Sequence, residues 1–202
     1  NFQVLALSRN QKPLEELQLK NITALSVDVC KQEDLEKVKT YIASEWNEVD
    51  ILIHNAGFLI NKPFENLTKD DFFRVFDVNV FGVAALTQVC IPYLKQGSHV
   101  VTISSMGGIQ GSLKFPGLAA YSSAKGAVIT LSELLAEEYK EQEIAFNVLA
   151  LGAVQTEMLE EAFPGYQAPI NAVDMANYIY NFSLSGNQFY NGKILQVAMT
   201  NP

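Results

Sequence analysis

Two kinds of residue are scarce in this chain, cysteine and basic side chains, and each scarcity excludes a class of function. The two cysteines, Cys30 and Cys90, are far apart and lack C-x-x-C spacing, so we expect neither a disulfide framework nor a metal site. The 14 Lys and Arg residues are outnumbered by 22 Asp and Glu, which gives a net charge of -8. Because phosphate backbones are bound by clustered cations, nucleic acid is not an expected partner.

Long uninterrupted apolar runs are also missing. Runs such as Val101–Ile103 and Ala145–Leu151 fall far short of the roughly 20 residues that cross a bilayer, so we expect no membrane span and a cytoplasmic protein. What the chain does have is a composition of 49% hydrophobic residues over 202 positions. That composition can bury the core of one domain, which we expect to extend over residues 1–202.

Apolar runs of strand length alternate with amphipathic stretches of helix length along the sequence. The expected strands are Gln3–Ser8, Thr23–Val27, Asp50–His54, Ser98–Ser104, Ala145–Leu151 and Lys193–Ala198. The expected helices are Lys12–Leu19, Gln32–Glu45, Thr68–Lys95, Ala119–Glu141 and Ala172–Phe182, and we expect loops at Gly107–Gly117 and Glu157–Pro169. This order predicts an α/β fold, in which helices cover both faces of a parallel sheet.

Tyr121 and Lys125 are spaced four residues apart on an expected helix, which puts a phenol and an ammonium on one face. A nearby cation favours the phenolate, so it would lower the pKa of Tyr121 from about 10 toward a value useful for proton transfer. Taken alone, the pair is weak evidence, because such a pair is more often a solvated pair on a surface helix.

Three further polar positions accompany this pair. Ser105 ends an apolar strand, at the edge where ligands of parallel sheets bind, although a serine there could simply cap a turn. Another strand ends in Asn55-Ala56-Gly57, whose small residues permit close approach of a ligand or form a plain turn. Asn79 lies on an otherwise apolar helical face, where it is either a core amide or a functional one.

In this order, the four motifs resemble those of the short-chain dehydrogenase/reductase family, and the resemblance extends from Val4 to about Val197. It implies a Rossmann-like doubly wound sheet and hydride transfer between a nicotinamide cofactor and a small carbonyl or alcohol substrate. In that scheme Tyr121 is the general acid/base, and Lys125 lowers its pKa and binds the nicotinamide ribose. Ser105 orients the substrate oxygen, and Asn79 holds a water in the proton relay.

The resemblance also assigns a cofactor. Ser8 and Arg9 end the first strand, where the Arg9 fork suits the 2′-phosphate of NADP(H), and an acidic residue would instead prefer NAD. Asp28 and Val29 match the adenine contact, although Asp28 could be a turn residue. The segment containing Asn55, Ala56 and Gly57 belongs to the same cofactor site. Gly152, Val154 and Thr156 match the segment that holds the nicotinamide carboxamide.

Some features depart from the family pattern. Leu151 replaces the usual proline before Gly152, and Ser105 and Tyr121 are sixteen residues apart, so Gly111–Pro116 is expected to bulge as an inserted loop. Ser104 is an alternative to Ser105. His54 stands where a second asparagine is usual, and we interpret it as structural.

The family fold also has a strand, a glycine-rich turn and a helix before the strand that begins at Gln3. No such glycine cluster precedes Val4, so we expect the natural chain to be longer by one βα unit of about 30 residues. The strand of that unit would be central, and its neighbours in this chain would have exposed edges.

Three functions remain open at this point. The first is an NADP-dependent carbonyl reductase or alcohol dehydrogenase, and the second is an NADPH-binding sensor or regulatory protein without turnover. A sugar epimerase is the third, although the short region after Thr156 leaves little room for a nucleotide-sugar domain. By analogy with relatives, the long helices Thr68–Lys95 and Ala119–Glu141 predict a homodimer or homotetramer.

Overall fold

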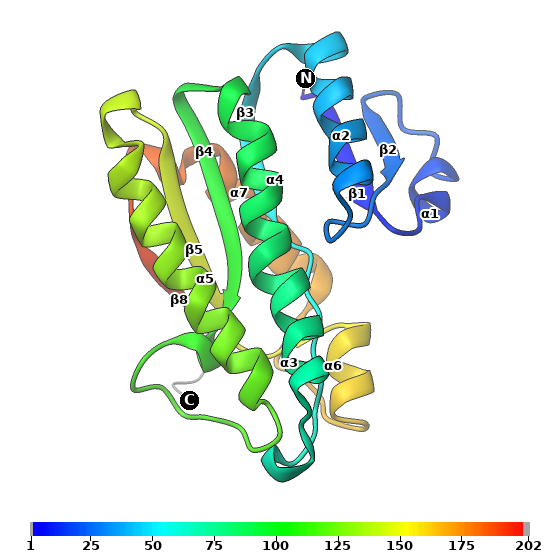
Figure 1. Ribbon diagram of the computed structural model, residues 1–202, viewed down its shortest axis with the longest axis vertical. Coiled ribbons are helices and arrows are strands. Elements are labelled where there is room, and N and C mark those ends of the chain that lie inside the picture. Colours follow the sequence, from blue (N-terminus) through cyan, green and yellow to red (C-terminus); the bar gives the residue numbers. More distant parts are fainter. Residues whose placement is uncertain (1, 200–202) are drawn as a thin grey trace.

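The chain folds into parallel β-sheets flanked by α-helices, which confirms the predicted fold class (Figure 1). A computed structural model describes residues 2–199, so residue 1 and residues 200–202 of the domain expected over 1–202 lie outside the described part. The strands are β1 (Val4–Ser8), β2 (Ile22–Ser26), β3 (Val49–His54), β4 (Leu94–Ser105), β5 (Ala145–Leu151), β6 (Val154–Gln155), β7 (Ile170–Asn171) and β8 (Ile194–Val197). The helices are α1 (Lys12–Glu15), α2 (Gln32–Tyr41), α3 (Lys69–Phe76), α4 (Gly82–Cys90), α5 (Ala119–Glu138), α6 (Glu157–Ala162) and α7 (Ala172–Ser185).

The central sheet has the order β3-β4-β5-β8, and all of its strands are parallel. Its register pairs Val101 of β4 with Ile53 of β3 on one side and with Asn147 of β5 on the other. Because the strands are parallel, their carboxyl ends share one edge, and the loops that follow them gather there. That edge is where the sequence predicts the ligand site.

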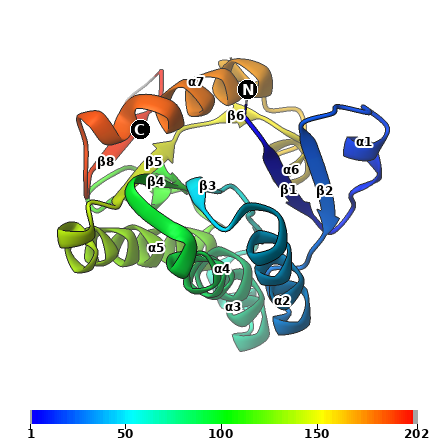
Figure 2. The ribbon, with the colours of Figure 1, turned by 90° about the horizontal axis from the view of Figure 1, so that it is seen from above.

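Helices cover both faces of the central sheet (Figure 2). Seen from above, α2, α4 and α5 lie against one face and α7 lies against the other. Buried side chains on the first face include Leu52, Val100 and Phe146, and Phe182 of α7 packs on Leu149 at the second. Burial on both sides explains why β5 is apolar at almost every position.

The strands β1 and β2 form a separate parallel pair (Figure 2). Within residues 2–199, β1 and β3 share no hydrogen-bonded ladder, and Val4 and Ile53 on these strands are 41% and 39% exposed. In the described residues the β1-β2 pair is therefore separate from the central sheet, and a third, short parallel pair joins β6 to β7.

The predicted helix at Thr68–Lys95 contains α3 and α4, joined by a π-helical turn at Asp77–Phe81. Its start is fixed by a capping box, because the Thr68 hydroxyl accepts from the Asp71 amide and the Asp71 carboxylate accepts from the Thr68 amide. By length and composition alone, the helical stretch Lys69–Tyr93 could cross a membrane. This is weak evidence for a span, because the core helices of soluble proteins pass the same test.

Several elements differ from the sequence prediction. Leu94 and Lys95, expected at the end of a helix, begin β4, and the helix expected at Gln32–Glu45 is α-helical to Tyr41 and π-helical after it. The helix expected at Lys12–Leu19 ends at Glu15, and Gln18 adopts a left-handed conformation at φ 49°. The loop expected at Glu157–Pro169 instead contains α6, whose first turn is capped by the Thr156 hydroxyl accepting from the Leu159 amide. Six residues give too short an apolar pattern to reveal a helix.

Candidate active site

Ser104 and Ser105 end β4 and have different surroundings. The Ser104 side chain is buried, and its hydroxyl donates a hydrogen bond to the Lys125 carbonyl at 2.9 Å. The Ser105 hydroxyl is half-buried and accepts from the Gly107 amide at 3.2 Å. Ser105 is therefore the serine whose oxygen faces the loop edge, while Ser104 joins β4 to α5.

Tyr121 and Lys125 lie one turn apart near the start of α5, as the spacing predicts. The Lys125 Nζ is 5.7 Å from the centroid of the Tyr121 ring and donates to the Ile103 carbonyl of β4 at 2.8 Å. Only 4% of Lys125 is exposed. A lysine this buried is rare unless a polar partner compensates it, so the carbonyl of Ile103 holds the ammonium beside the phenol.

The two side chains titrate in opposite directions from their ordinary values. Burial lowers the pKa of Lys125 to about 8, because the charged ammonium loses hydration. Burial raises the pKa of Tyr121 to about 12, and hydrogen bonding with the Ser105 side chain works in the opposite direction. The sequence predicts a tyrosine pKa lowered by Lys125, and this structure differs because desolvation outweighs the favourable effects on the phenolate.

The backbone of the turn after β4 approaches α5 closely. A Cβ at Gly108 would lie 2.7 Å from the Lys125 carbonyl carbon and 2.9 Å from the Gly126 amide nitrogen. Only glycine fits this contact, which brings the Ser105 turn against the helix that carries Tyr121. Sequence reasoning missed this role for Gly108, although the pair Gly107-Gly108 signals a close approach. The segment Gly111–Pro116 forms the loop that the sequence predicts.

Asn79 lies in the π-helical turn and is fully hydrogen-bonded. Its Nδ2 donates to the carbonyls of Phe58 and Val75 at 2.7 Å, and its Oδ1 accepts from the Phe58 amide at 3.3 Å. These bonds fix the segment after β3, where a Cβ at Gly57 would be 3.4 Å from the Asn79 Oδ1 and 3.8 Å from the Lys125 Nζ. The π-helical turn thus places Asn79 beside Lys125. Turns of this kind inside α-helices are frequent at functional sites.

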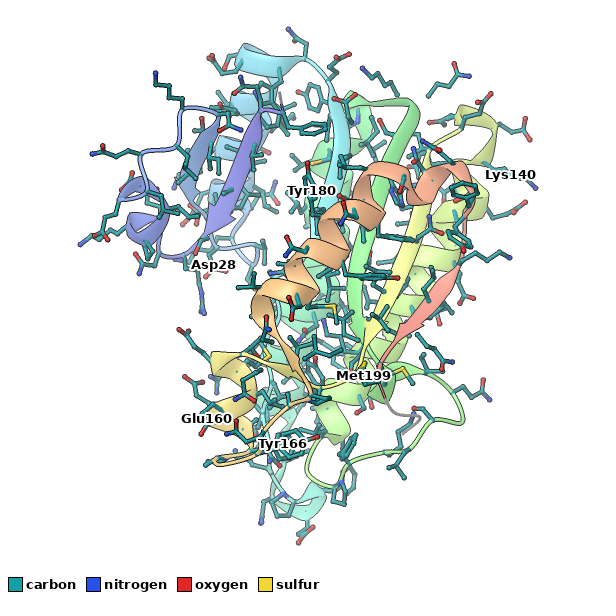
Figure 3. The ribbon with its side chains drawn as sticks, turned by 180° about the vertical axis from the view of Figure 1, so that it is seen from behind. Asp28, Lys140, Glu160, Tyr166, Tyr180 and Met199 are labelled. Atoms are coloured by element: carbon teal, nitrogen blue, oxygen red, sulfur yellow. The ribbon has the colours of Figure 1, made fainter. Side chains whose placement is uncertain are left out.

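The positions expected to bind the adenosine end follow β1 and β2. Arg9 is exposed, and its carbonyl accepts from the Ser26 hydroxyl, while the Ser8 hydroxyl accepts from the Asn10 amide. The Asp28 carboxylate accepts from the Cys30 amide at 3.1 Å. Figure 3 shows Asp28 beyond the end of β1, on the same side of the molecule as Glu160 and Tyr166 of the segment after β6.

Other predicted cofactor positions have identifiable structural contacts. A Cβ at Gly82 would lie only 2.7 Å from the side chain of Val29, so Val29 packs against this glycine. A Cβ at Gly152 would lie 2.8 Å from the Ala198 Cβ, and the Gly152 amide donates to the Val197 carbonyl. Asn55 and Ala56 follow β3 and are exposed. In the segment after β5, Val154 of β6 pairs with Ile170 of β7, and Thr156 caps α6.

A family model for the short chain dehydrogenases matches residues 1–167. The chain belongs to this family. A 3-amino-tetrahydro-pyrrolizinone reductase of Xenorhabdus hominickii is 28% identical to this short-chain dehydrogenase over 169 residues, which cover 82% of the chain and 58% of the relative. A 3-oxoacyl-(acyl-carrier-protein) reductase of Thermotoga maritima is 28% identical over 137 residues, covering 67% and 54%. The chain spans about half the length of these curated relatives.

Solved structures share the fold of this short-chain dehydrogenase. ElxO with NADP bound superposes with a TM-score of 0.83 at 23% identity, covering 96% of this chain and 86% of that chain. A 3-ketoacyl-(acyl-carrier-protein) reductase from Brucella melitensis, complexed with NADH, gives 0.83 at 24% identity with the same coverage. One of these two neighbours was therefore solved with NADP and the other with NADH.

Proposed function

We propose that this short-chain dehydrogenase reduces a small carbonyl compound with NADP(H). The observation that carries the proposal is the buried Lys125 ammonium, held by the Ile103 carbonyl within 5.7 Å of the Tyr121 ring centroid. Burying a charged lysine costs free energy, and an apolar side chain could fill the same space without that cost. Buried ionisable groups with shifted pKa values are concentrated at functional sites. Both curated relatives bear the names of reductases, which supports this direction of reaction.

The residues at the strand ends fit a nicotinamide dinucleotide. Gly57 leaves open the space between Asn79 and Lys125 that a side chain would fill, so a ligand can approach the backbone there. Lys125 supplies an ammonium donor for ribose hydroxyls, and the exposed Arg9 supplies a guanidinium at the end of β1. Bound NADP(H) supplies a hydride to the substrate carbon.

The chain's own residues handle the proton and the charge on the substrate oxygen. Since burial raises the pKa of Tyr121 to about 12, its phenol is protonated at neutral pH and can donate that proton to an oxygen. Ser105 can donate a hydrogen bond to the same oxygen as negative charge develops. The Lys125 ammonium stabilises the phenolate that remains after the transfer.

Cofactor preference rests on Arg9. A guanidinium can bind a 2′-phosphate with two parallel hydrogen bonds, which an adenosine hydroxyl cannot match. Asp28, an acidic residue that follows β2, has its carboxylate engaged with the Cys30 amide. We therefore favour NADP(H) over NAD(H), although solved relatives bind both.

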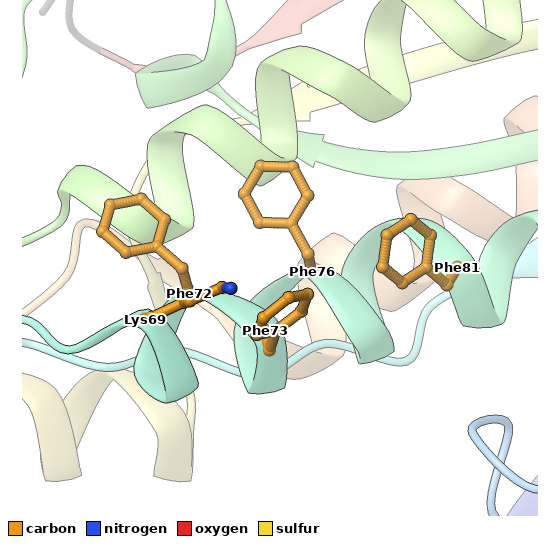
Figure 4. A pocket seen from close by; sticks show the side chains of 5 residues that line it. All are labelled: Lys69, Phe72, Phe73, Phe76 and Phe81. Carbon is orange, nitrogen blue, oxygen red and sulfur yellow. The ribbon is translucent and has the colours of Figure 1, made fainter.

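We also propose that the protein is a homodimer or homotetramer formed through its long helices. Phe73 and Phe81 are 54% and 52% exposed on one side of α3 and the π-helical turn, and they line a groove with Lys69, Phe72 and Phe76 (Figure 4). Exposed aromatic clusters of this kind favour association. Sedimentation should give a mass of two or four chains, and Phe73→Asp with Phe81→Asp should shift it to the monomer.

Substrate-dependent oxidation of NADPH tests the proposed function. With a panel of small aldehydes and ketones, the wild-type chain should turn over, and Tyr121→Phe should lose about a hundredfold or more while still binding NADPH. Tyr139→Phe, at the far end of α5, is the matched control and should keep full activity. Binding of NADPH without turnover on any carbonyl would instead identify a sensor.

A further inference from the structure

Three segments follow the carboxyl ends of strands and meet around one side chain, that of Asn61. They are residues 58–67 after β3, residues 109–118 after β4, and α6 after β6. The Asn61 Nδ2 donates a hydrogen bond to the Ala162 carbonyl at 2.8 Å, across 101 positions of the sequence. Ala162 is the last residue of α6, so this bond satisfies a carbonyl that a helix end leaves without a partner.

The other side of Asn61 contacts the loop of residues 109–118. Gly117 adopts φ 89°, and the space that a Cβ would occupy there is taken by the Asn61 Oδ1. The amide of the neighbouring Lys62 donates to the Gly117 carbonyl at 3.0 Å. The Asn61 side chain thus links α6 to the loop of residues 109–118. Its contact with this loop is possible only because residue 117 is a glycine.

This link is connected to the candidate active site. Asn79 holds the backbone of Phe58 on both its amide and its carbonyl, which anchors the segment that carries Asn61. On α6, the Met158 Cε lies 3.6 Å from the position of a Cβ at Gly57, and that position is 3.8 Å from the Lys125 Nζ. The placement of α6 therefore determines how closely Met158 covers the space beside the lysine.

We propose that Asn61 is a latch that holds α6 against the loop of residues 109–118 and so closes the wall of the active site. Asn61 is a positioning residue, since it touches neither Tyr121 nor Lys125 in this structure. Closure excludes water from the buried ammonium and narrows the space for the substrate to small carbonyl compounds. The effect on catalysis rests on the proposed function, whereas the closure itself does not.

Hydrogen exchange in the full chain tests the latch without any substrate. The amides of Phe163 and Gly165 bond to Leu159 and Glu160, so their exchange reports the opening of α6. Asn61→Asp keeps the size of the side chain but removes the donor, and it should speed this exchange about fivefold, the factor for roughly 1 kcal/mol of net hydrogen bonding. Unchanged exchange in this variant would overturn the proposal.

Two glycines in the same loop give a matched comparison. Gly117→Ala should displace Asn61 and speed the exchange as Asn61→Asp does, and combining the two should add little further. Gly111 also has a positive φ, of 80°, but nothing lies within 4 Å of its Cβ position, so Gly111→Ala carries the backbone strain alone. Equal effects of Gly111→Ala and Gly117→Ala on α6 exchange would overturn the latch.

Kinetics separate the latch from the proposed function. For a carbonyl that the wild type reduces, Asn61→Asp should raise KM about fivefold and leave kcat within about twofold, because the proton donor is unaltered. An equal fall in kcat with unchanged KM would contradict a positioning role. Faster α6 exchange in a chain that reduces no carbonyl would support the latch and refute the proposed function.

Discussion

Lys125 and Ile103 are joined by a hydrogen bond of 2.8 Å, from the lysine Nζ to the main-chain carbonyl. A second hydrogen bond also joins β4 to α5, but here the donor is on β4: the Ser104 hydroxyl donates to the Lys125 carbonyl at 2.9 Å. The end of β4 therefore holds both the side chain and the backbone of Lys125. The buried ammonium is thereby fixed in position relative to Tyr121.

Replacing each of the two serines should give different defects. Ser104→Ala removes a buried hydrogen bond to the Lys125 carbonyl and should lower the free energy of unfolding by about 0.5–1.5 kcal/mol. Ser105→Ala should lower kcat about a hundredfold with a smaller loss of stability, because its hydroxyl is half-buried and acts on the substrate oxygen. Denaturant unfolding and turnover of both variants check this. The reverse assignment of defects would make Ser104 the functional serine.

Gly108→Ala should damage both stability and activity. The added Cβ would lie 2.7 Å from the backbone of Lys125, so the turn after β4 must move away from α5 and carry Ser105 with it. We expect a loss of about 1–3 kcal/mol in the free energy of unfolding and at least about a tenfold fall in kcat. Gly126→Ala is the comparison, because its one tight contact is 3.2 Å and alanine favours a helix interior. That variant should be nearly neutral in stability.

The sequence predicts the large elements because each carries a long, regular signal. The run Ala145–Leu151 is apolar at every position except Asn147 and forms β5 with those bounds, and the Tyr121 and Lys125 spacing places both side chains on one face of α5. These signals are local, so no tertiary information is needed to read them. The order of the motifs then identifies the family.

Other features depend on tertiary contacts and leave little trace in the sequence. The link from Asn61 to Ala162 joins residues that are far apart in the chain, and the direction of the Tyr121 pKa is set by burial that spacing does not show. The short α6 has too few residues for a periodic pattern. The π-helical turn that places Asn79 is likewise hidden inside one continuous helical stretch.

Acid should destabilise the fold through His54. Its ring is buried against the Thr87 hydroxyl at 2.8 Å, and burial lowers its pKa to about 4. Between about pH 4 and the unfolded value of about 6.5, the unfolded chain binds more protons, so stability falls as the pH falls through this window. The contribution of His54 is about 3 kcal/mol when the window has been crossed.

The test compares how steeply the free energy of unfolding changes with pH in the wild type and in a variant of His54. The free energy of unfolding of His54→Gln should change less between about pH 6.5 and about pH 4 than that of the wild type. Part of the slope should remain, because burial also lowers the pKa of His99. Identical slopes in the two proteins would show that His54 does not titrate in this way.

Arg9→Glu should change the cofactor preference. Replacing a guanidinium by a carboxylate removes charge-assisted bonds to a 2′-phosphate and adds repulsion, so the ratio of NADPH to NADH affinity should fall about tenfold or more. Lys12→Glu makes the same change of charge on the exposed α1 and serves as the control. Titration with NADPH and with NADH measures the two affinities. An equal shift of their ratio in both variants would indicate a general electrostatic effect and contradict the role of Arg9.

The pH dependence of kcat/KM for carbonyl reduction tests the pairing of Lys125 with Tyr121 most directly. Burial lowers the pKa of Lys125 to about 8 and raises that of Tyr121 to about 12, so the lysine loses its charge first as the pH rises. We expect kcat/KM to fall above about pH 8, and Lys125→Met to be about a hundredfold slower and to lack this decline. A wild-type profile that stays flat from about pH 7 to about pH 10 would contradict the account.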